Sequence, residues 1–401
     1  MKNLLPLFIM IILILFTQSC KTSQQKRKNI SKNFIEENVS FAAKQYGLMI
    51  DKIEDSAKIV NPKSIIEGKM KYIVPQEWTS GFFPGSLWYL YELTGDEKWK
   101  PLAIKYTEAL DTIQYYTGNH DVGFMIYCSY GNGLRLSGNN DYKNVIINAA
   151  KSLSTRYITN AGIIQSWNAN KSKDWECPVI IDNMMNLELL FEATKLSGDS
   201  TFYNIAITHA NNTIKNHYRS DYSTWHVVDY DKNNGSVRHK NTHQGYSDES
   251  AWARGQSWGI YGYTLCYRET KDQKYLDQAE KALAFIANHP NYPEDGVPFW
   301  DFDAPEIPNT YRDVSAGAIL ASALYELSTY SNKMDYEAWA DKIMTSLASS
   351  NYRAKLGQNG DFLLMHSVGS LPHNSEVDVP LNYADYYFLE ALMRKLKIEN
   401  Y

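Results

Sequence analysis

The stretch 187-LELLFEATKLSGDSTFYNIA-206 decides the fold. Its first half repeats apolar residues with a helical period, Gly198 and Asp199 form a polar turn, and an aromatic residue opens a second amphipathic run. Periodic segments on both sides of a glycine turn are typical of two helices joined as a hairpin.

The same order of apolar run, polar turn, aromatic residue and second run recurs along the chain. It is found in 87-LWYLYELTGDEKW-99, 132-NGLRLSGNNDYKN-144, 264-TLCYRETKDQKYLDQAEKA-282 and 324-LYELSTYSNKMDYEAWA-340. The turns are roughly 45 to 75 residues apart, which is too irregular for a solenoid of short fixed repeats.

With a first helix from about Asn33 and a last helix in 382-NYADYYFLEALMRKL-396, these units give about a dozen helices. Helices that each bury one face must close on themselves or stack. We therefore predict an all-α fold, an (α/α)6 barrel whose hairpins close into a toroid, with one catalytic domain over residues 33–401. Strand signals are limited to 223-STWHVVDY-230 and 361-DFLLMHSV-368. The long loops should build the active site at one end of the ring.

The beginning of the chain has the pattern of an export signal. Lys2 supplies a positive charge, an apolar run covers residues 4–16, and 17-TQSC-20 follows. We predict a signal peptide over residues 1–19, because the run is short for a transmembrane span. The small residue before Cys20 resembles a bacterial lipoprotein cleavage site, which implies lipidation of Cys20 and a polar tether over residues 20–32. An ordinary signal with a chance cysteine is the alternative.

Lipidation at Cys20 would place the protein in the periplasm or at the cell surface, with a lipid anchor as its only contact with the bacterial membrane. The net charge of −5 argues against a nucleic-acid partner. Cys128, Cys177 and Cys266 are odd in number and have no metal-binding spacing, so we expect buried free thiols. We expect neither a metal nor an organic cofactor, because the chain also lacks a glycine-rich phosphate loop.

Aromatic residues make up 13% of the chain, with 30 Tyr and 10 Trp, which suits a carbohydrate site lined with rings. Trp78 in 75-PQEWTSGFFPGSLW-88 and Trp167 in 163-IIQSWNANKSKDW-175 are candidates for stacking on sugar faces. Packing at a helix end is the alternative, and for a single tryptophan it is the better one. The stretch 242-THQGYSDESAWARGQSWGIYGYT-264 places Trp252 and other rings among charged and amide groups, which indicates a polar site with flat walls.

Two aspartates are candidates for proton transfer. Asp121 lies in 118-GNHDVGFMIYCSYG-131 and Asp182 in 177-CPVIIDNMMNLELLFEATKL-196, each just before a helical run. The apolar residues before Asp182 should desolvate its carboxyl group and raise its pKa, as a proton donor requires. Capping of the helix by Asp182 and a local turn at Asp121 are the alternatives, and for Asp182 the residues alone favour neither.

Two further side chains have an open role. His226 is a candidate base or hydrogen-bond donor, but a core histidine with satisfied nitrogens is the better interpretation from the residue alone. Arg254 has donors suited to a carboxylate. Its alternative is a structural ion pair with Asp248 or Glu249.

Five segments together resemble the unsaturated glucuronyl hydrolases of glycoside hydrolase family 88. They are 119-NHDVGF-124, 180-IIDNMMNLELLF-191, 243-HQGYSDESAWARGQSWGIYG-262, 299-FWDFDAP-305 and 312-RDVSAGAI-319. The resemblance runs from about Trp78 to Ala391. It implies removal of a 4,5-unsaturated uronic acid from the non-reducing end of lyase-generated oligosaccharides, by hydration of the C4=C5 vinyl ether.

The resemblance also implies roles for individual residues. Asp182 would be the general acid and base, with Asp121 beside it as the second catalytic residue. The implied substrate contacts are His226, Gln244, Arg254, Trp78, Trp167, Trp252 and Ser367.

Relatives that accept sulfated glycosaminoglycans carry a Ser and Lys cluster near the C-terminal end. Here the region reads 365-MHSVGSLPHNSEVDVPLNYADYY-387, with Ser367 and Ser370 present but Pro372 about where the lysine would stand. Chondroitin, hyaluronan, heparin-type and ulvan fragments therefore all stay open.

Three other functions compete with this one. An unsaturated rhamnogalacturonyl hydrolase acting on pectin fragments would share the toroid and the aspartates, but the segment around Arg254 weighs against it. A toroidal sugar epimerase would use histidine pairs whose signatures the sequence lacks. A non-catalytic glycan-binding lipoprotein would need neither Asp121 nor Asp182.

Overall fold

The computed structural model describes residues 30–53 and 59–399 of the chain. The predicted signal peptide, Cys20 and most of the tether lie outside the described residues. The chain divides into residues 1–30 and 31–401, and the architecture below is that of the second part. Among the described residues, no helix is long and apolar enough to span a membrane.

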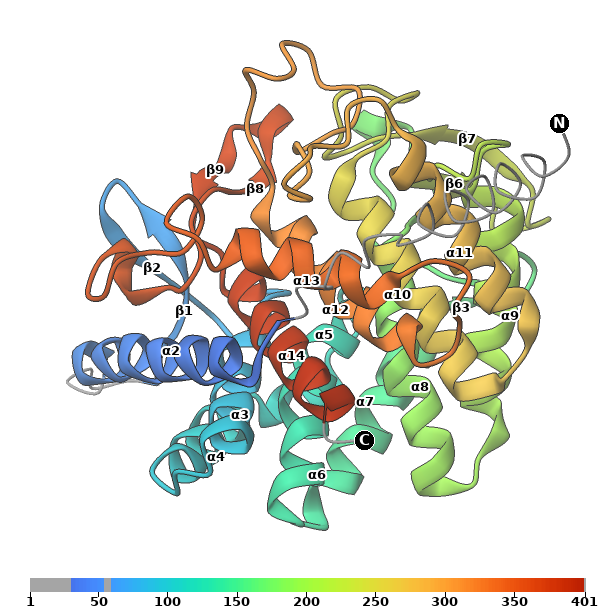
Figure 1. Ribbon diagram of the computed structural model, residues 1–401. Coiled ribbons are helices and arrows are strands. Elements are labelled where there is room, and N and C mark those ends of the chain that lie inside the picture. Colours follow the sequence, from blue (N-terminus) through green and yellow to red (C-terminus); the bar gives the residue numbers. More distant parts are fainter. Residues whose placement is uncertain (1–29, 54–58, 400–401) are drawn as a thin grey trace, which may run out of the picture. The chain divides into compact units, whose positions relative to one another are not determined.

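The helices form an inner and an outer ring (Figure 1). The inner ring contains α3 (Phe82–Thr94), the continuous segment α5 (Val122–Ile126), η2 (Tyr127–Gly131) and α6 (Asn132–Ser137), then α8 (Asn183–Ser197), α10 (Ala253–Thr270), α12 (Val314–Ser328) and α14 (Asn382–Glu399). The outer ring contains α2 (Lys32–Ile53), α4 (Trp99–Glu108), α7 (Asp141–Ser154), α9 (Ser200–His217), α11 (Gln273–Asn288) and α13 (Tyr336–Leu347). Each inner segment packs on the next, and α14 packs on α3. This closed ring confirms the predicted (α/α)6 barrel.

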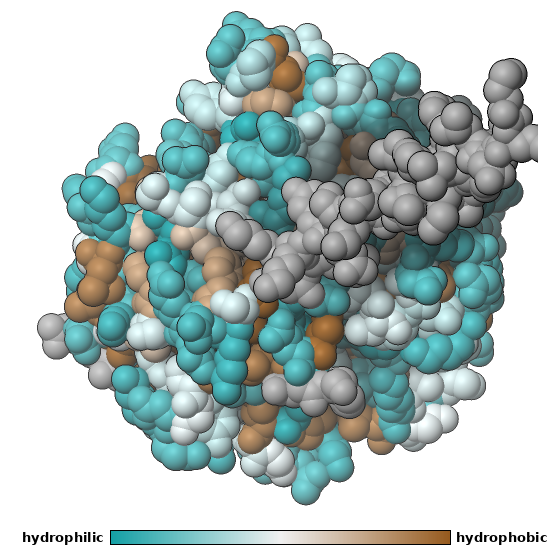
Figure 2. Space-filling model, in the orientation of Figure 1, coloured by the Kyte–Doolittle hydropathy of each residue, from teal (hydrophilic) through white to brown (hydrophobic). Residues whose placement is uncertain are grey.

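The two rings differ in burial as their sequences require. In α10 every residue from Ala253 to Cys266 is buried, because neighbours surround an inner helix. The outer helix α11 buries mainly one face, which includes Tyr275, Ala279 and Leu283 at four-residue spacing. On the face seen in Figure 2, hydrophobic residues of the described chain are scattered among hydrophilic ones. Most apolar side chains are therefore buried inside the ring and do not form a large patch on this face.

The hairpin predicted over residues 187–206 forms as expected. α8 ends at Gly198, whose φ of 75° lies in the left-handed region that glycine adopts without a steric penalty. Asp199 then caps α9, because its side chain accepts a hydrogen bond of 2.9 Å from the Thr201 backbone N–H.

Short antiparallel strands decorate the ring. They are β1 (Asn61–Ile66) with β2 (Lys69–Ile73), β3 (Tyr157–Ile158) with β4 (Ile163–Ile164), the sheet of β5 (Pro178–Ile180), β6 (Val227–Tyr230) and β7 (Val237–Asn241), and β8 (Ser367–Ser370) with β9 (Ser375–Val379). Short 3-10 turns lie at η1 (Asp111–Tyr115), η3 (Lys171–Lys173), η4 (Asn359–Asp361) and η5 (Leu371–His373). The strand predicted in residues 223–230 is confirmed by β6. Of the strand predicted in residues 361–368, only the last two residues lie in a strand, which is β8. The β1–β2 hairpin was not predicted from the sequence.

Candidate active site

Four charged side chains lie where inner helices begin. Asp121, Asp182 and Asp313 occupy the N-cap positions of α5, α8 and α12, and Arg254 lies in the first turn of α10. Because inner and outer helices alternate along the chain, the inner helices all begin at one end of the ring, which we call the N-terminal end. The free N–H groups of these helix starts favour negative charge there.

Asp182 lies against the core without capping its helix. Only 6% of the residue is exposed, its side chain makes no capping hydrogen bond, and its Oδ2 atom has no hydrogen-bond partner among the described residues. Burial raises the pKa of Asp182 to about 7, although the charge of Arg254 and the indole N–H of Trp258 oppose that shift. The expectation of a raised pKa is confirmed, and the capping alternative is wrong.

Asp121 is the second buried carboxyl group of the site. It is 7% exposed, and its side chain does not cap α5. Instead Asn119 Oδ1 accepts the backbone N–H of Asp121 at 3.0 Å, so the local-turn alternative is wrong for the Asp121 carboxyl group. Burial and the charge of Asp182 raise the pKa of Asp121 well above its usual range. Both carboxyl groups are therefore protonated more readily than a solvent-exposed aspartate.

Close packing of α5 on α8 brings the two acids together. A Cβ atom on Gly123 would lie 2.5 Å from Asn186 Oδ1 and 2.6 Å from its Cα, so only glycine fits. Asn186 Oδ1 accepts the Phe124 backbone N–H at 3.0 Å. Its amide nitrogen lies 3.4 Å from His120 Nδ1, and His120 Nε2 lies 3.2 Å from Asp121 Oδ1.

His120 is the neutral partner of Asp121. Burial lowers the pKa of His120 to about 3. With Nδ1 accepting from Asn186, the proton of the neutral ring is on Nε2, which faces the Asp121 carboxyl group. His120 lies in the motif 119-NHDVGF-124 but was not among the predicted site residues. Its position directly before Asp121 was the available signal.

His226 faces Asp182 with one nitrogen and the backbone with the other. His226 Nδ1 accepts the backbone N–H groups of His243 and Gln244 at 3.0 and 3.1 Å. Its Nε2 therefore carries the proton and lies 3.8 Å from Asp182 Oδ2. Burial lowers the pKa of His226 well below its usual range. Nε2 has no hydrogen-bond partner among the described residues, so the alternative of a fully satisfied core histidine is wrong.

Arg254 is fixed by partners other than those expected. Its side chain is 1% exposed. Nη1 donates to Asp313 Oδ2 at 2.7 Å and to the Val368 carbonyl at 2.5 Å, and Nη2 donates to the Gly369 carbonyl at 2.6 Å. The alternative of an ion pair with Asp248 or Glu249 is wrong.

The guanidinium of Arg254 has donors beyond these bonds. A guanidinium has five N–H donors, and three of them make the bonds described above. Within the described part of the chain, Nε has no partner. Nε and one N–H of Nη2 are therefore left near Asp182, whose pKa the Arg254 charge lowers.

The predicted tryptophans occupy different positions. Trp252 is 3% exposed and lies between the His226 ring, 4.4 Å away, and the guanidinium carbon of Arg254, 4.5 Å away. Its burial favours support of these two side chains over stacking on a sugar. Trp78 and Trp167 are half-buried. The Trp167 ring lies 6.2 Å from that of His226, whereas Trp78 packs 5.6 Å from Phe124, which follows Asp121.

The β8–β9 hairpin completes the site. Gln244 Nε2 donates to the Gly369 carbonyl at 2.9 Å, the same oxygen that Arg254 Nη2 contacts. Ser367 is fully buried, and its hydroxyl has no partner among the described residues. Sequence analysis grouped Gln244, Arg254 and Ser367 as substrate contacts, and the structure joins the hairpin that carries Ser367 to the other two residues.

A family match accompanies this geometry. The family model described as Glycosyl Hydrolase Family 88 matches residues 49–391. The chain belongs to glycoside hydrolase family 88.

Two curated relatives extend along most of this family 88 chain. One from Formosa agariphila, named unsaturated glucuronyl hydrolase, is 46% identical over 98% of this chain and 98% of its own length. Another of the same name from Bacillus sp. strain GL1 is 34% identical over 82% of this chain and 89% of its own. A crystal structure described as an unsaturated glucuronyl hydrolase specific for heparin has a TM-score of 0.88 and 46% identity, covering 92% of this chain and 99% of that one.

These matches confirm the predicted family and the glycosidase class. They do not favour the pectin-fragment or the non-catalytic alternative. The free thiols Cys128, Cys177 and Cys266 are buried, as expected. Among the described residues, no group of His, Cys, Asp and Glu is placed to hold a metal ion.

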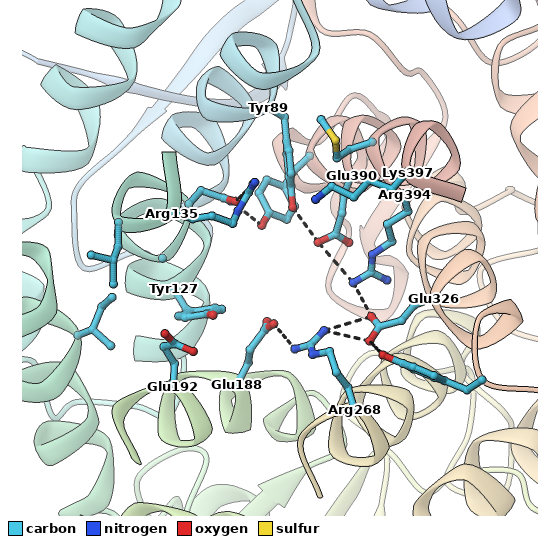
Figure 3. A pocket seen from close by; sticks show the side chains of 17 residues that line it. Tyr89, Tyr127, Arg135, Glu188, Glu192, Arg268, Glu326, Glu390, Arg394 and Lys397 are labelled. Carbon is cyan, nitrogen blue, oxygen red and sulfur yellow. Dashed lines mark hydrogen bonds and ion pairs between the residues drawn. The ribbon is translucent and has the colours of Figure 1, made fainter. Parts of the chain in front are cut away.

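A cavity of about 660 Å³ lies at the other end of the family 88 barrel, and Figure 3 shows the side chains that line it. Residues from the later turns of the inner helices line it, including Glu188, Arg268, Glu326, Glu390 and Arg394. Arg268 pairs with Glu188 and Glu326, and Arg394 pairs with Glu326 and Glu390. Because these charges neutralise one another, the cavity has the character of a structural ion-pair network. The two buried aspartates, with neighbours that lack partners among the described residues, make the N-terminal end the candidate active site.

Proposed function

We propose that this chain removes the 4,5-unsaturated uronic acid from the non-reducing end of oligosaccharides left by polysaccharide lyases. The observation that carries the proposal is the buried pair Asp121 and Asp182. Asp182 has a pKa of about 7 and an oxygen without a hydrogen-bond partner among the described residues. A proton donor that works near neutral pH needs such a group, whereas a protein that only binds glycans does not.

Protonation of the vinyl ether is the first step. The C4=C5 bond of the substrate is conjugated with the ring oxygen and carries a carboxylate on C5. Protonated Asp182 donates to C4, and the π electrons of the double bond form the new C4–H bond. Positive charge is left on C5 and shared with the ring oxygen, while Asp182 becomes a carboxylate.

Hydration and ring opening complete the reaction. Water adds to C5 and gives its proton to the Asp182 carboxylate, which regenerates the acid. The hemiketal at C5 opens by breaking its bond to the ring oxygen, and the resulting hemiacetal at C1 releases the second sugar. Because the enzyme displaces nothing at C1, the spacing of two carboxylates does not set the outcome as it does in ordinary glycosidases.

The neighbouring groups suit the substrate. Asp121, whose pKa burial raises well above its usual range, lies beside Asp182 and hydrogen-bonds a sugar hydroxyl. The Nε2–H of His226 lies 3.8 Å from Asp182 Oδ2 and is placed to hold the substrate or the attacking water. The free donors of Arg254 take the C5 carboxylate. Trp78 and Trp167 flank the sugar, while Gln244 and Ser367 supply further polar contacts.

The test is Asp182→Asn with a lyase-made unsaturated disaccharide, followed by loss of the ultraviolet absorbance of the C4=C5 bond. We expect turnover to fall by about 10²–10⁴-fold, the scale of general acid catalysis, with disaccharide binding changed only a few-fold. Asp199→Asn is the matched control, because Asp199 also precedes a helix but caps it, and Asn retains that cap. A tenth of the wild-type rate in Asp182→Asn would show that the acid is another group, with Asp121 the next candidate.

We further propose that Cys20 is lipidated and that the protein is anchored to a bacterial membrane in the periplasm or at the cell surface. The support is the order of charge, apolar run and small residue before Cys20. Cys20→Ser should move the full-length protein from the membrane fraction to the soluble fraction with an unchanged rate constant. Continued membrane association of the serine variant would contradict the anchor.

A further inference from the structure

The Nδ1 atom of His120 is surrounded by hydrogen-bond donors. Asn186 Oδ1 accepts the Phe124 backbone N–H at 3.0 Å, so the Asn186 amide nitrogen is the atom that lies 3.4 Å from His120 Nδ1. Ser166 Oγ accepts the Ile180 backbone N–H at 3.0 Å and lies 3.4 Å from the same Nδ1. Because the Ser166 hydroxyl keeps its own proton to donate, Nδ1 has two donors directed at it and acts as an acceptor.

The Nε2 atom of the same ring has acceptors beside it. It lies 3.2 Å from Asp121 Oδ1. Asn183 Nδ2 donates to the Ile164 carbonyl at 2.7 Å, which leaves the Asn183 oxygen as an acceptor. Burial lowers the pKa of His120 to about 3, and the polar contact of the ring with the Asn183 side chain opposes that shift only in part. The single proton of the neutral ring is therefore held on Nε2 by its surroundings on both sides.

This proton distinguishes the two oxygens of Asp121. A donor beside Oδ1 makes that oxygen an acceptor, which favours Oδ2 as the oxygen that carries a proton or meets a substrate hydroxyl. Nε2 is close to Oδ1 but makes no aligned hydrogen bond among the described residues. Contacts of this kind at catalytic groups often tighten only when the substrate is bound.

The contacts that fix the His120 ring also come from the segments that carry Asp182. Asn186 lies one turn after Asp182 on α8. Ile180, whose N–H the Ser166 hydroxyl accepts, lies at the end of β5, two residues before Asp182. Rotation of the ring would break its contacts with both segments, so its orientation is tied to the position of the second acid.

We propose that His120 is a positioning residue for Asp121. Its Nε2–H holds Oδ1 and turns Oδ2 toward the substrate, while Asn186 and Ser166 keep the ring in the required tautomer. The proposal rests on the proposed function, in which Asp121 contacts a sugar hydroxyl, and adds the group that orients Asp121.

The kinetic experiment compares two substitutions of one residue. His120→Gln can place an amide N–H near the position of Nε2, whereas His120→Asn reaches only the position of Nδ1. His120→Asn should lower kcat/KM on an unsaturated disaccharide by roughly tenfold to a hundredfold, the scale of leaving a buried polar group unpaired. His120→Gln should retain kcat/KM within about fivefold of wild type, although both variants lose ring packing and should melt at similarly lowered temperatures.

His209→Asn is the matched control. His209 is as fully buried as His120, and burial lowers its pKa to about 3 as well. Its Nδ1 accepts the Ile164 backbone N–H at 3.0 Å, a bond that the oxygen of an asparagine can take over. The control variant should melt at a lower temperature but keep kcat/KM within about twofold of wild type.

A neutron structure of the deuterated wild-type protein tests the tautomer without a substrate or a variant. A deuteron on His120 Nε2 and none on Nδ1 is the expected result, and a deuteron on Nδ1 would overturn the proposal. Equal losses of kcat/KM in His120→Gln and His120→Asn, or a loss as large in His209→Asn, would also overturn it, because packing alone would then explain the effect. Absence of turnover by the wild-type protein would instead contradict the proposed function and leave the neutron result to decide the tautomer.

Discussion

Replacement of Arg254 by alanine tests how one buried cation serves both the fold and the substrate. Arg254 Nη1 pairs with Asp313 at 2.7 Å, and the side chains of both residues are almost fully buried. Arg254 Nε has no partner among the described residues. On the proposed function the change therefore removes a structural pair and a contact to the C5 carboxylate together, and the two effects should appear in different measurements.

The expected loss of stability follows from the charge left behind. Removing one partner of a buried ion pair costs about 3–5 kcal/mol, because the other partner remains desolvated without compensation. For roughly 370 residues the unfolding entropy is about 0.8 kcal/mol per kelvin, so the melting temperature should fall by about 4–6 °C. Asp313 keeps its bonds to the Ser315 backbone and hydroxyl, which places the result at the lower end of this range.

The expected kinetic effect is mainly on KM. Two donors to a carboxylate are worth about 1.5–3 kcal/mol each, so their loss should raise KM at least about a hundredfold. The same cation next to C5 opposes the positive charge that develops there, so kcat should fall less. Arg254 also lowers the pKa of Asp182. Without it that pKa rises, and the alkaline limb of the rate profile should move to higher pH.

The assay measures KM, kcat and melting temperature on one preparation of Arg254→Ala, with Arg254→Lys beside it. The lysine variant should recover part of the KM, because a point charge cannot reproduce the guanidinium fork. The double variant Arg254→Ala with Asp313→Ala should regain stability relative to Arg254→Ala while KM stays high. An unchanged KM with a lowered melting temperature would refute the substrate role, and an unchanged melting temperature would refute the structural one.

Two further predictions follow from the acid pair and from the sequence. Asp182 ionises near pH 4 in the unfolded chain and near pH 7 in the folded one, so stability falls as pH rises through this window, by up to about 4 kcal/mol above pH 7. Asp182→Asn should therefore be more stable than wild type at pH 8 but not at pH 4, and melting curves that differ equally at both pH values would contradict this. A chelator should leave kcat/KM unchanged, because the chain has no Cys/His spacing typical of a metal site; activity lost to the chelator and restored by a divalent ion would show otherwise.

The repeated hairpins could be predicted because their signals are local. Helix periodicity and the turn glycines lie within about 20 residues of each other, so the hairpin over residues 187–206 could be predicted from the sequence. The closed ring could be predicted because the same hairpin pattern recurs along the chain. The raised pKa of Asp182 was predictable for the same reason, since the apolar residues that bury it directly precede it in the chain.

The contacts of the site could not be predicted, because they join distant segments. The alternatives for Arg254 were acids a few residues away, whereas its partner Asp313 begins a different inner helix. Likewise Pro372 stands about where sulfate-accepting relatives would carry a lysine. The structure instead places Lys173, from a much earlier loop, near His373 through His243. The contacts of Arg254 with Asp313 and of Lys173 with His243 form only when the folded ring brings distant segments together, so no local sequence pattern predicts them.

The position of the acids at helix starts sets two physical effects against each other. A helix N-terminus favours a carboxylate by about 0.3–1 kcal/mol, which would lower its pKa by less than one unit. Burial acts in the opposite direction and brings the pKa of Asp182 to about 7, a shift worth about 4 kcal/mol. Burial therefore wins. An aspartate that capped its helix would have its carboxylate form stabilised by hydrogen bonds, and its proton would be lost at neutral pH. The uncapped side chains of Asp121 and Asp182 thus lack the stability that a cap contributes, and burial keeps the pKa of Asp182 at about 7, as the proposed donation to C4 requires.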